Sequence, residues 1–203
     1  MIAHARKSVG AAWLLVVRDP KAWDEFDLSA DGFFRSFAAI LFVIPFNIVF
    51  DLFALRLRQA GGLEEADAAG AAAYSYSKMA FSTTSLCVEW MLYVILAYFL
   101  LKFLGLAGQY VRFIVAYNWG CVIVELFNLP AVVLFSFGLV SYASAVDLVF
   151  IALGLTLYYR FYIAQTALGV GWGLAMGIAV LEFLFTIFFG YGLQQVSSLW
   201  VTG

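Results

Sequence analysis

Three glutamates stand in stretches of sequence that are apolar enough to lie inside a lipid bilayer: Glu89, Glu125 and Glu182. Such carboxylates cost about 2.5–3.5 kcal/mol each to insert, so they normally face other protein groups rather than lipid. If the three side chains meet, they cannot all be charged unless a cation lies between them or they share protons. Their type and spacing therefore indicate proton or cation handling near mid-bilayer, with Asp51 at the outer mouth of the site.

A purely structural role for the same acids is the competing hypothesis. Each carboxyl group, protonated or hydrogen-bonded to a tyrosine, an asparagine or a backbone carbonyl, would then only fix the packing of its own helix. The sequence indicates how deep each acid lies, but it does not show in which direction the side chain points around the helix axis. Both hypotheses therefore stay open at this level.

The segments that carry these acids have the composition of membrane-spanning helices. Of the 203 residues, 65% are hydrophobic and only 12% are charged, whereas soluble domains have about 25% charged residues. A helix needs roughly 20 apolar residues to cross a hydrocarbon core, and five stretches meet this requirement: residues 33–55, 79–104, 111–138, 144–168 and 171–192. The sequence predicts an all-α, polytopic membrane helix bundle with about five transmembrane helices and an N-terminal interfacial helix.

Proline and glycine should shape three of these spans. Pro45 and Pro130 each remove a backbone donor and clash with the preceding turn, so we expect them to kink or break the first and third spans. The step into the last span reads GVGWGLAMG and places Gly169, Gly173 and Gly177 at four-residue spacing. This spacing allows close helix approach, either within the chain or between two copies of it.

The spans divide the chain into three parts. Residues 1–32 form a cytoplasmic, interfacial N-terminal segment because SVGAAWLLVV is too short to cross a membrane. Residues 33–192 form the five-helix transmembrane domain, and residues 193–203 form a short external tail. Ser29 or Asp31 can cap the first spanning helix. A flexible connection follows that helix, as predicted by the Gly- and Ala-rich stretch RQAGGLEEADAAGAAAYS.

Basic residues near the helix ends set the orientation. The N-terminal side collects eight of them and the opposite side three, so the N-terminus of this multi-pass protein should be cytoplasmic. Arg160 lies among tyrosines in TLYYRFYIAQ, which is typical of the membrane interface, and we expect its guanidinium to reach lipid headgroups. A salt bridge to an interior acid is the alternative.

Other classes of function find little support in the sequence. It contains no G-x-S-x-G, H-E-x-x-H, P-loop or dinucleotide fingerprint, and the single histidine, His4, lies far from Cys87 and Cys121. We therefore expect no enzymatic activity, no cofactor and no metal site. The 11 Lys and Arg against 13 Asp and Glu argue against nucleic acid as a partner. The expected partners are membrane lipids and either a second copy of the chain or other membrane-protein subunits.

Three features resemble the Yip1 family of small membrane proteins. They are the element DPKAWDEF before the first span, the five closely spaced spans, and the tyrosine- and alanine-rich connection YYRFYIAQTALGVGWGLAMGIAVLEFLF. The resemblance, which is to bacterial members of this shape, implies a five-helix fold in a bacterial inner (plasma) membrane. It also implies a non-enzymatic role as a binding, scaffold or accessory subunit in membrane organisation, although the soluble tail of the family is short here. The alternatives are a proton- or cation-coupled transporter or channel that uses the carboxylates, and a protein that handles lipids.

Overall fold

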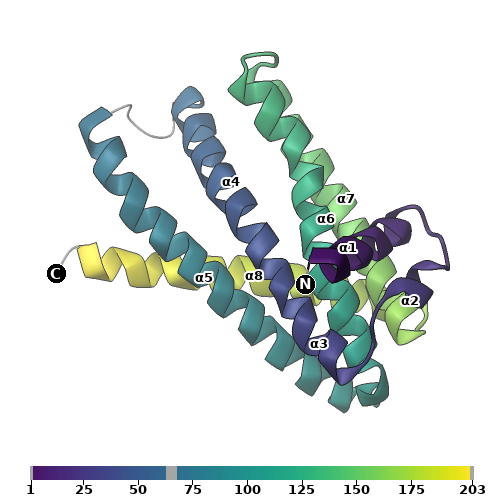
Figure 1. Cartoon of the computed structure of the whole chain (residues 1–203). Helices are drawn as coiled ribbons and strands as arrows, with labels where there is room; N and C mark the ends of the chain where they lie inside the picture. The colour runs from purple at the N-terminus through teal and green to yellow at the C-terminus, as the bar shows by residue number, and fades with distance from the viewer. Residues whose placement is uncertain (1, 63–67, 202–203) are drawn as a thin grey trace.

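The computed structural model describes residues 2–62 and 68–201, and every regular element in these residues is helical (Figure 1). Five helical segments are long and apolar enough to cross a membrane: Ala30–Ala60, Ala80–Phe103, Ala107–Ser136, Tyr142–Leu168 and Trp172–Leu193. The predicted all-α, multi-pass bundle is therefore confirmed. The α-helices are α1 (Ile2–Val16), α2 (Ala22–Glu25), α3 (Ala30–Ser36), α4 (Ile40–Ala60), α5 (Ala68–Phe103), α6 (Tyr110–Ser136), α7 (Tyr142–Leu168) and α8 (Trp172–Val201).

Helix α6 lies at the centre of the bundle. It contacts α1, α3, α4, α5 and α7, and every residue from Phe113 to Ile123 is buried. A helix that is buried on all sides must be apolar all round, which explains why α6 shows no single hydrophobic face. Helix α8 packs against α7 and α5 and crosses the other helices steeply in Figure 1.

The N-terminal helix α1 packs on the bundle and belongs to the same hydrophobic core. Its small residues Ala11 and Ala12 are fully buried together with Leu15, so its backbone comes close to α6 and α7. The hydroxyl of Tyr159 in α7 donates a hydrogen bond of 2.8 Å to the Ala12 carbonyl. Residues that the sequence assigns to an interfacial segment therefore help to hold α7 in place.

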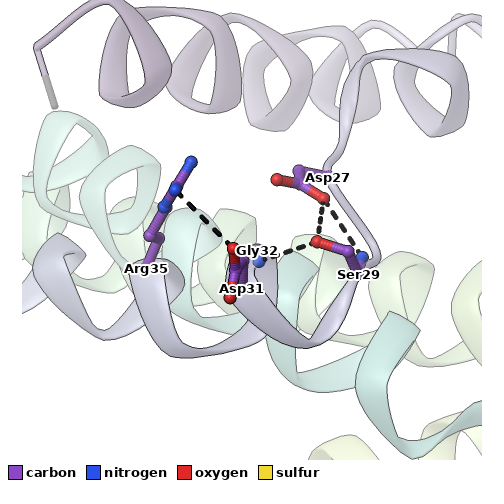
Figure 2. Close-up of polar contacts among 5 residues, drawn as sticks. All are labelled: Asp27, Ser29, Asp31, Gly32 and Arg35. Atoms are coloured by element: carbon purple, nitrogen blue, oxygen red, sulfur yellow. Dashed lines mark hydrogen bonds and ion pairs between the residues drawn. The ribbon is translucent and has the colours of Figure 1, made fainter.

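The predicted cap of the first spanning helix is confirmed at Ser29 (Figure 2). Its hydroxyl accepts a hydrogen bond of 3.1 Å from the Gly32 amide, and it donates one of 2.6 Å to the Asp27 carboxylate. The Ser29 hydroxyl and amide both bind this carboxylate and lower the pKa of Asp27. A charged carboxylate is thereby held near the positive end of the α3 dipole. The other candidate, Asp31, instead forms an ion pair with Arg35, in which Asp31 Oδ2 lies 3.8 Å from Arg35 Nη2.

The structure differs from the expected span boundaries in three places. Helix α4 continues through Pro45 and α6 through Pro130, so neither proline breaks its helix and only the alternative of a kink stays a prediction. Neighbouring helices hold each segment, and a membrane helix tolerates the loss of one hydrogen bond. The Ala-rich part of the expected flexible connection is helical from Ala68, while residues 63–67 lie outside the described residues. Helix α8 continues to Val201 over most of the stretch expected to be a tail.

Gly32 provides a test of the turn that leads into α3. A Cβ atom at this position would overlap with the Asp27 carbonyl oxygen. We expect Gly32→Ala to lower the free energy of unfolding by about 1–3 kcal/mol, because the turn must open to admit the methyl group. Denaturant unfolding in detergent would measure the loss.

Gly10 is the matched control for this substitution. It lies on the exposed side of α1, and no atom is within 4 Å of a Cβ built there. Gly10→Ala should be neutral or stabilising by up to about 1 kcal/mol, because alanine favours the helix. Equal unfolding free energies for the two variants would contradict the role assigned to Gly32.

Candidate functional site

The three predicted glutamates line one cavity of about 310 Å³. Glu89 comes from α5, Glu125 from α6 and Glu182 from α8, and Arg160 of α7 lines the same cavity. Glu89 and Glu182 lie near the middle of their candidate spans, residues 80–103 and 172–193. The fold thus turns the three acids, which the sequence places at a common depth, toward a shared space.

The strongest polar contact in this cavity is the ion pair of Arg160 with Glu182. Arg160 Nε lies 3.0 Å from Glu182 Oε1, and the two side chains are only 9% and 12% exposed. The Nε–H is not aligned for a hydrogen bond, so the contact is an attraction between charges. Burial in a medium of low dielectric strengthens this attraction, and it also makes an unpaired charge costly.

Helix α6 provides the remaining partners of the guanidinium. Arg160 Nη1 donates to the Tyr117 carbonyl at 3.2 Å, and Nη2 donates to Cys121 Sγ at 3.1 Å. The guanidinium carbon also lies 4.1 Å from the centre of the Tyr117 ring, and Tyr93 of α5 stacks on that ring at 4.4 Å. A cation over an aromatic face gains about 2 kcal/mol when water is excluded.

These contacts overturn the expected role of Arg160. Its guanidinium does not reach lipid headgroups, because it points into the bundle and is held there by α6 and α8. The alternative of a salt bridge to an interior acid is the one that the structure contains. A single arginine thereby ties α7 to two neighbouring helices.

The other two glutamates have no paired cation among the described residues. Arg160 forms its ion pair with Glu182 and with neither Glu125 nor Glu89, although it is near enough to act electrostatically on Glu125. Glu89 of α5 and Thr186 of α8 both line the cavity. Three carboxyl groups therefore share one guanidinium, and the cavity has an excess of acidic groups.

Apolar side chains form most of the remaining wall. They come from α4 to α8 and are Val43, Leu86, Val124, Leu153, Leu157, Ala179 and Phe183. Trp90 of α5 adds an aromatic surface, and Thr156 and Thr186 add hydroxyl groups. Water inside such a space has few polar partners apart from the acids, so the carboxyl groups dominate its chemistry.

A buried polar chain fixes the tryptophan of this wall. Trp90 Nε1 donates to Asn118 Oδ1 at 2.8 Å, and Asn118 Nδ2 donates to Ser36 Oγ at 2.8 Å. Ser36 in turn donates to the Phe33 carbonyl at 2.6 Å. Asn118 and Ser36 are fully buried, and a satisfied network of this kind rigidifies its surroundings.

Asp51 is not part of the cavity. Helix α4 contributes Val43 to the wall, and Asp51 lies eight residues further along, about 12 Å up the helix axis at 1.5 Å per residue. Its Oδ2 atom is buried with no hydrogen-bond partner among the described residues. Asp51 therefore does not line the cavity, because α4 touches the cavity only near its beginning, and the place of Asp51 at the outer mouth of the site stays a prediction.

The three predicted packing glycines do not bring helices together within the described chain. Gly169 ends α7 in a left-handed conformation with φ of 65°, and Gly173 and Gly177 lie on an exposed face of α8. No atom lies within 4 Å of a Cβ built on any of them. Close approach inside the chain is excluded there, and contact with another molecule stays a prediction.

Tyr117, Cys121 and Trp90 are site residues that the sequence reasoning did not select. A signal for two of them was present, because Tyr117, Cys121 and Glu125 follow at four-residue spacing and share one face of α6. Thr156 and Arg160 in α7 are related in the same way. Grouping polar residues by helix face would have found these partners of the acids.

Comparisons of the chain with protein-family models, curated proteins and solved structures found no match. The fold and the cavity nevertheless define a class. The chain is a multi-pass helical membrane protein whose candidate spans enclose a cavity lined by three glutamates and an arginine.

A double-mutant cycle would test the buried ion pair. We expect Arg160→Met to lower the free energy of unfolding by about 3–5 kcal/mol, because Glu182 would keep a buried charge without a partner. Glu182→Gln should also destabilise, and the double variant should lose less than the sum of the single losses. Unfolding in detergent with increasing denaturant would measure all three.

The exposed pair of Lys7 and Glu25, at 3.3 Å, is the control for this cycle. Both side chains are about half exposed to solvent, so Lys7→Met should cost less than about 1 kcal/mol. Strictly additive losses at Arg160 and Glu182 would show that the two residues are not coupled.

Proposed function

We propose that this protein moves protons or a cation across a membrane by means of the cavity between α5, α6, α7 and α8. The observation that supports this function is that three carboxyl groups share one mostly apolar cavity with a single guanidinium. Ionisable residues inside a membrane typically mark ion or substrate pathways. Acids with a purely structural role need only bond to separate neighbours, and they have no reason to converge.

The ion pair offers a way to couple occupancy of the cavity to a change of shape. Arg160 and Glu182 link α7 to α8, and α8 otherwise contacts mainly α7 and α5. A proton on Glu182 removes the attraction, and a cation beside it competes with the guanidinium. Either event would loosen α8 from α7 and alter access to Glu89 and Glu125.

Glu125→Gln is the sharpest test of this proposal. Glu125 forms no ion pair with Arg160, so the variant should fold while proton or monovalent-cation flux falls at least tenfold. The flux would be measured in proteoliposomes with an internal pH dye under an imposed membrane potential. Asp147→Asn, which changes an exposed acid of α7, should leave the flux unchanged.

Equal fluxes in the two variants would contradict the transport function. A Glu125→Gln protein that fails to fold would instead favour the structural role of the acids, since its loss would then be explained by helix packing alone.

A second candidate is the Yip1-like role as a binding, scaffold or accessory subunit of the inner membrane. The observation that favours it is the open glycine face of α8 at Gly173 and Gly177. Without side chains there, another membrane helix could approach the α8 backbone closely. The occupant would be a second copy of the chain or another membrane-protein subunit.

Self-association can be tested at this face. Gly177→Leu should raise the dissociation constant of a dimer in lipid at least tenfold, because the leucine side chain blocks close helix approach. Energy transfer between labelled copies would measure it. Gly154→Leu is the control, since Gly154 is an exposed helical glycine of α7 that is equally open. Identical behaviour of the two variants would contradict this second function.

A further inference from the structure

We propose that the ligand of the cavity is a lipophilic organic cation with one positive charge, such as a quaternary ammonium that carries an aromatic group. This inference rests on the proposed function, because it names the class of substrate that the same cavity would take. It follows from the charge of the cavity, the nature of its wall and the position of its edge.

The charge of the cavity selects a cation. Glu182 forms an ion pair with Arg160, whereas Glu89 and Glu125 have no paired cation among the described residues. A positive ligand is therefore attracted to the part of the cavity formed by these two acids. The Arg160 guanidinium, which is paired with Glu182, repels a positive ligand from its own vicinity, so the two unpaired acids are the favoured place for the charge.

The wall of the cavity selects an organic ligand. Its volume of about 310 Å³ corresponds to a small-molecule site, for which volumes start at about 300 Å³. Leucine, valine and phenylalanine side chains supply much of the apolar part of this wall. The Trp90 ring is held in place by Asn118 and gives a fixed aromatic surface against which a quaternary ammonium group can bind.

The acids are not arranged around a bare metal ion. Among the residues that the structure describes, no three side chains of His, Cys, Asp or Glu are close enough together to hold a metal. The carboxyl groups instead come from three helices, α5, α6 and α8. This arrangement suits a diffuse charge surrounded by apolar groups.

The edge of the cavity selects a lipophilic ligand. Thr186 of α8 lines the cavity and is exposed, and Glu89 of α5 beside it is half-buried. Both residues lie within their candidate spans rather than at a helix end, so this side of the cavity faces the lipid region. A ligand that arrives from there must partition into the bilayer, which a cation with large apolar groups does more readily than a strongly hydrated inorganic ion.

Isothermal titration of the full-length protein in detergent with benzyltrimethylammonium tests this inference. This probe has a permanent charge and one aromatic ring. We expect saturable binding that weakens at least tenfold in Glu89→Gln and in Glu125→Gln, and that is unchanged in Asp147→Asn. Leu157→Phe keeps all four charged groups but reduces the space, so it should also weaken binding at least tenfold.

Competition experiments with the unsubstituted protein test the same inference without the risk that a variant fails to fold. Neopentylbenzene has the shape of the probe without its charge and should not displace it, and neither should an equal concentration of potassium ions. Displacement by neopentylbenzene would show an apolar cavity without charge selection, and displacement by potassium would show an inorganic cation site. Either result, or no binding of the probe, would overturn the inference.

The outcomes for this inference and for the proposed function can be separated. Carboxylate-dependent binding without flux in proteoliposomes would leave the organic-cation site standing and remove the transport function. Glu125-dependent flux of protons without binding of the probe would support transport and overturn the assignment of the ligand.

Discussion

A buried guanidinium cannot be left without partners, and this constraint organises the interior of the bundle. Arg160 lies in α7 among apolar residues, where an unpaired charge would cost several kilocalories per mole. Its partners are a carboxylate of α8 and a carbonyl and a thiol of α6. All three helices must therefore keep their register for the contacts to persist. Arg160 therefore fixes the positions of α6, α7 and α8 relative to one another.

The same constraint explains the asymmetry of the cavity. Because the guanidinium is occupied by Glu182, Glu89 and Glu125 share the space without a paired cation among the described residues. A cavity with balanced charges would serve only to join helices. Under the proposed function, the two unpaired acids would take up a proton or a cation, which would weaken the ion pair that connects α7 to α8.

The cavity lies where tightly and loosely packed parts of the bundle meet. On one side, buried hydrogen bonds of Asn118 in α6 join this helix to Trp90 of α5 and to Ser36 of α3. The hydrogen bond of Tyr159 joins α7 to α1. On the other side, α8 has a largely exposed surface and contacts mainly α7 and α5. Under the proposed function, motion of α8 relative to the hydrogen-bonded part of the bundle would change access to the acids.

The sequence by itself determined the helices, a cap at either Ser29 or Asp31, and the expected common depth of the three glutamates. These properties depend on the length of apolar runs and on local hydrogen bonds, which neighbouring residues along the chain decide. Only the tertiary structure decided that Arg160 turns inward, that Asp51 lies apart from the cavity and that α4 and α6 continue through their prolines. The direction in which a side chain points around its helix axis becomes meaningful only when the neighbouring helices are in place. A buried charge such as Arg160 is tolerated only because residues distant in the sequence pair with it.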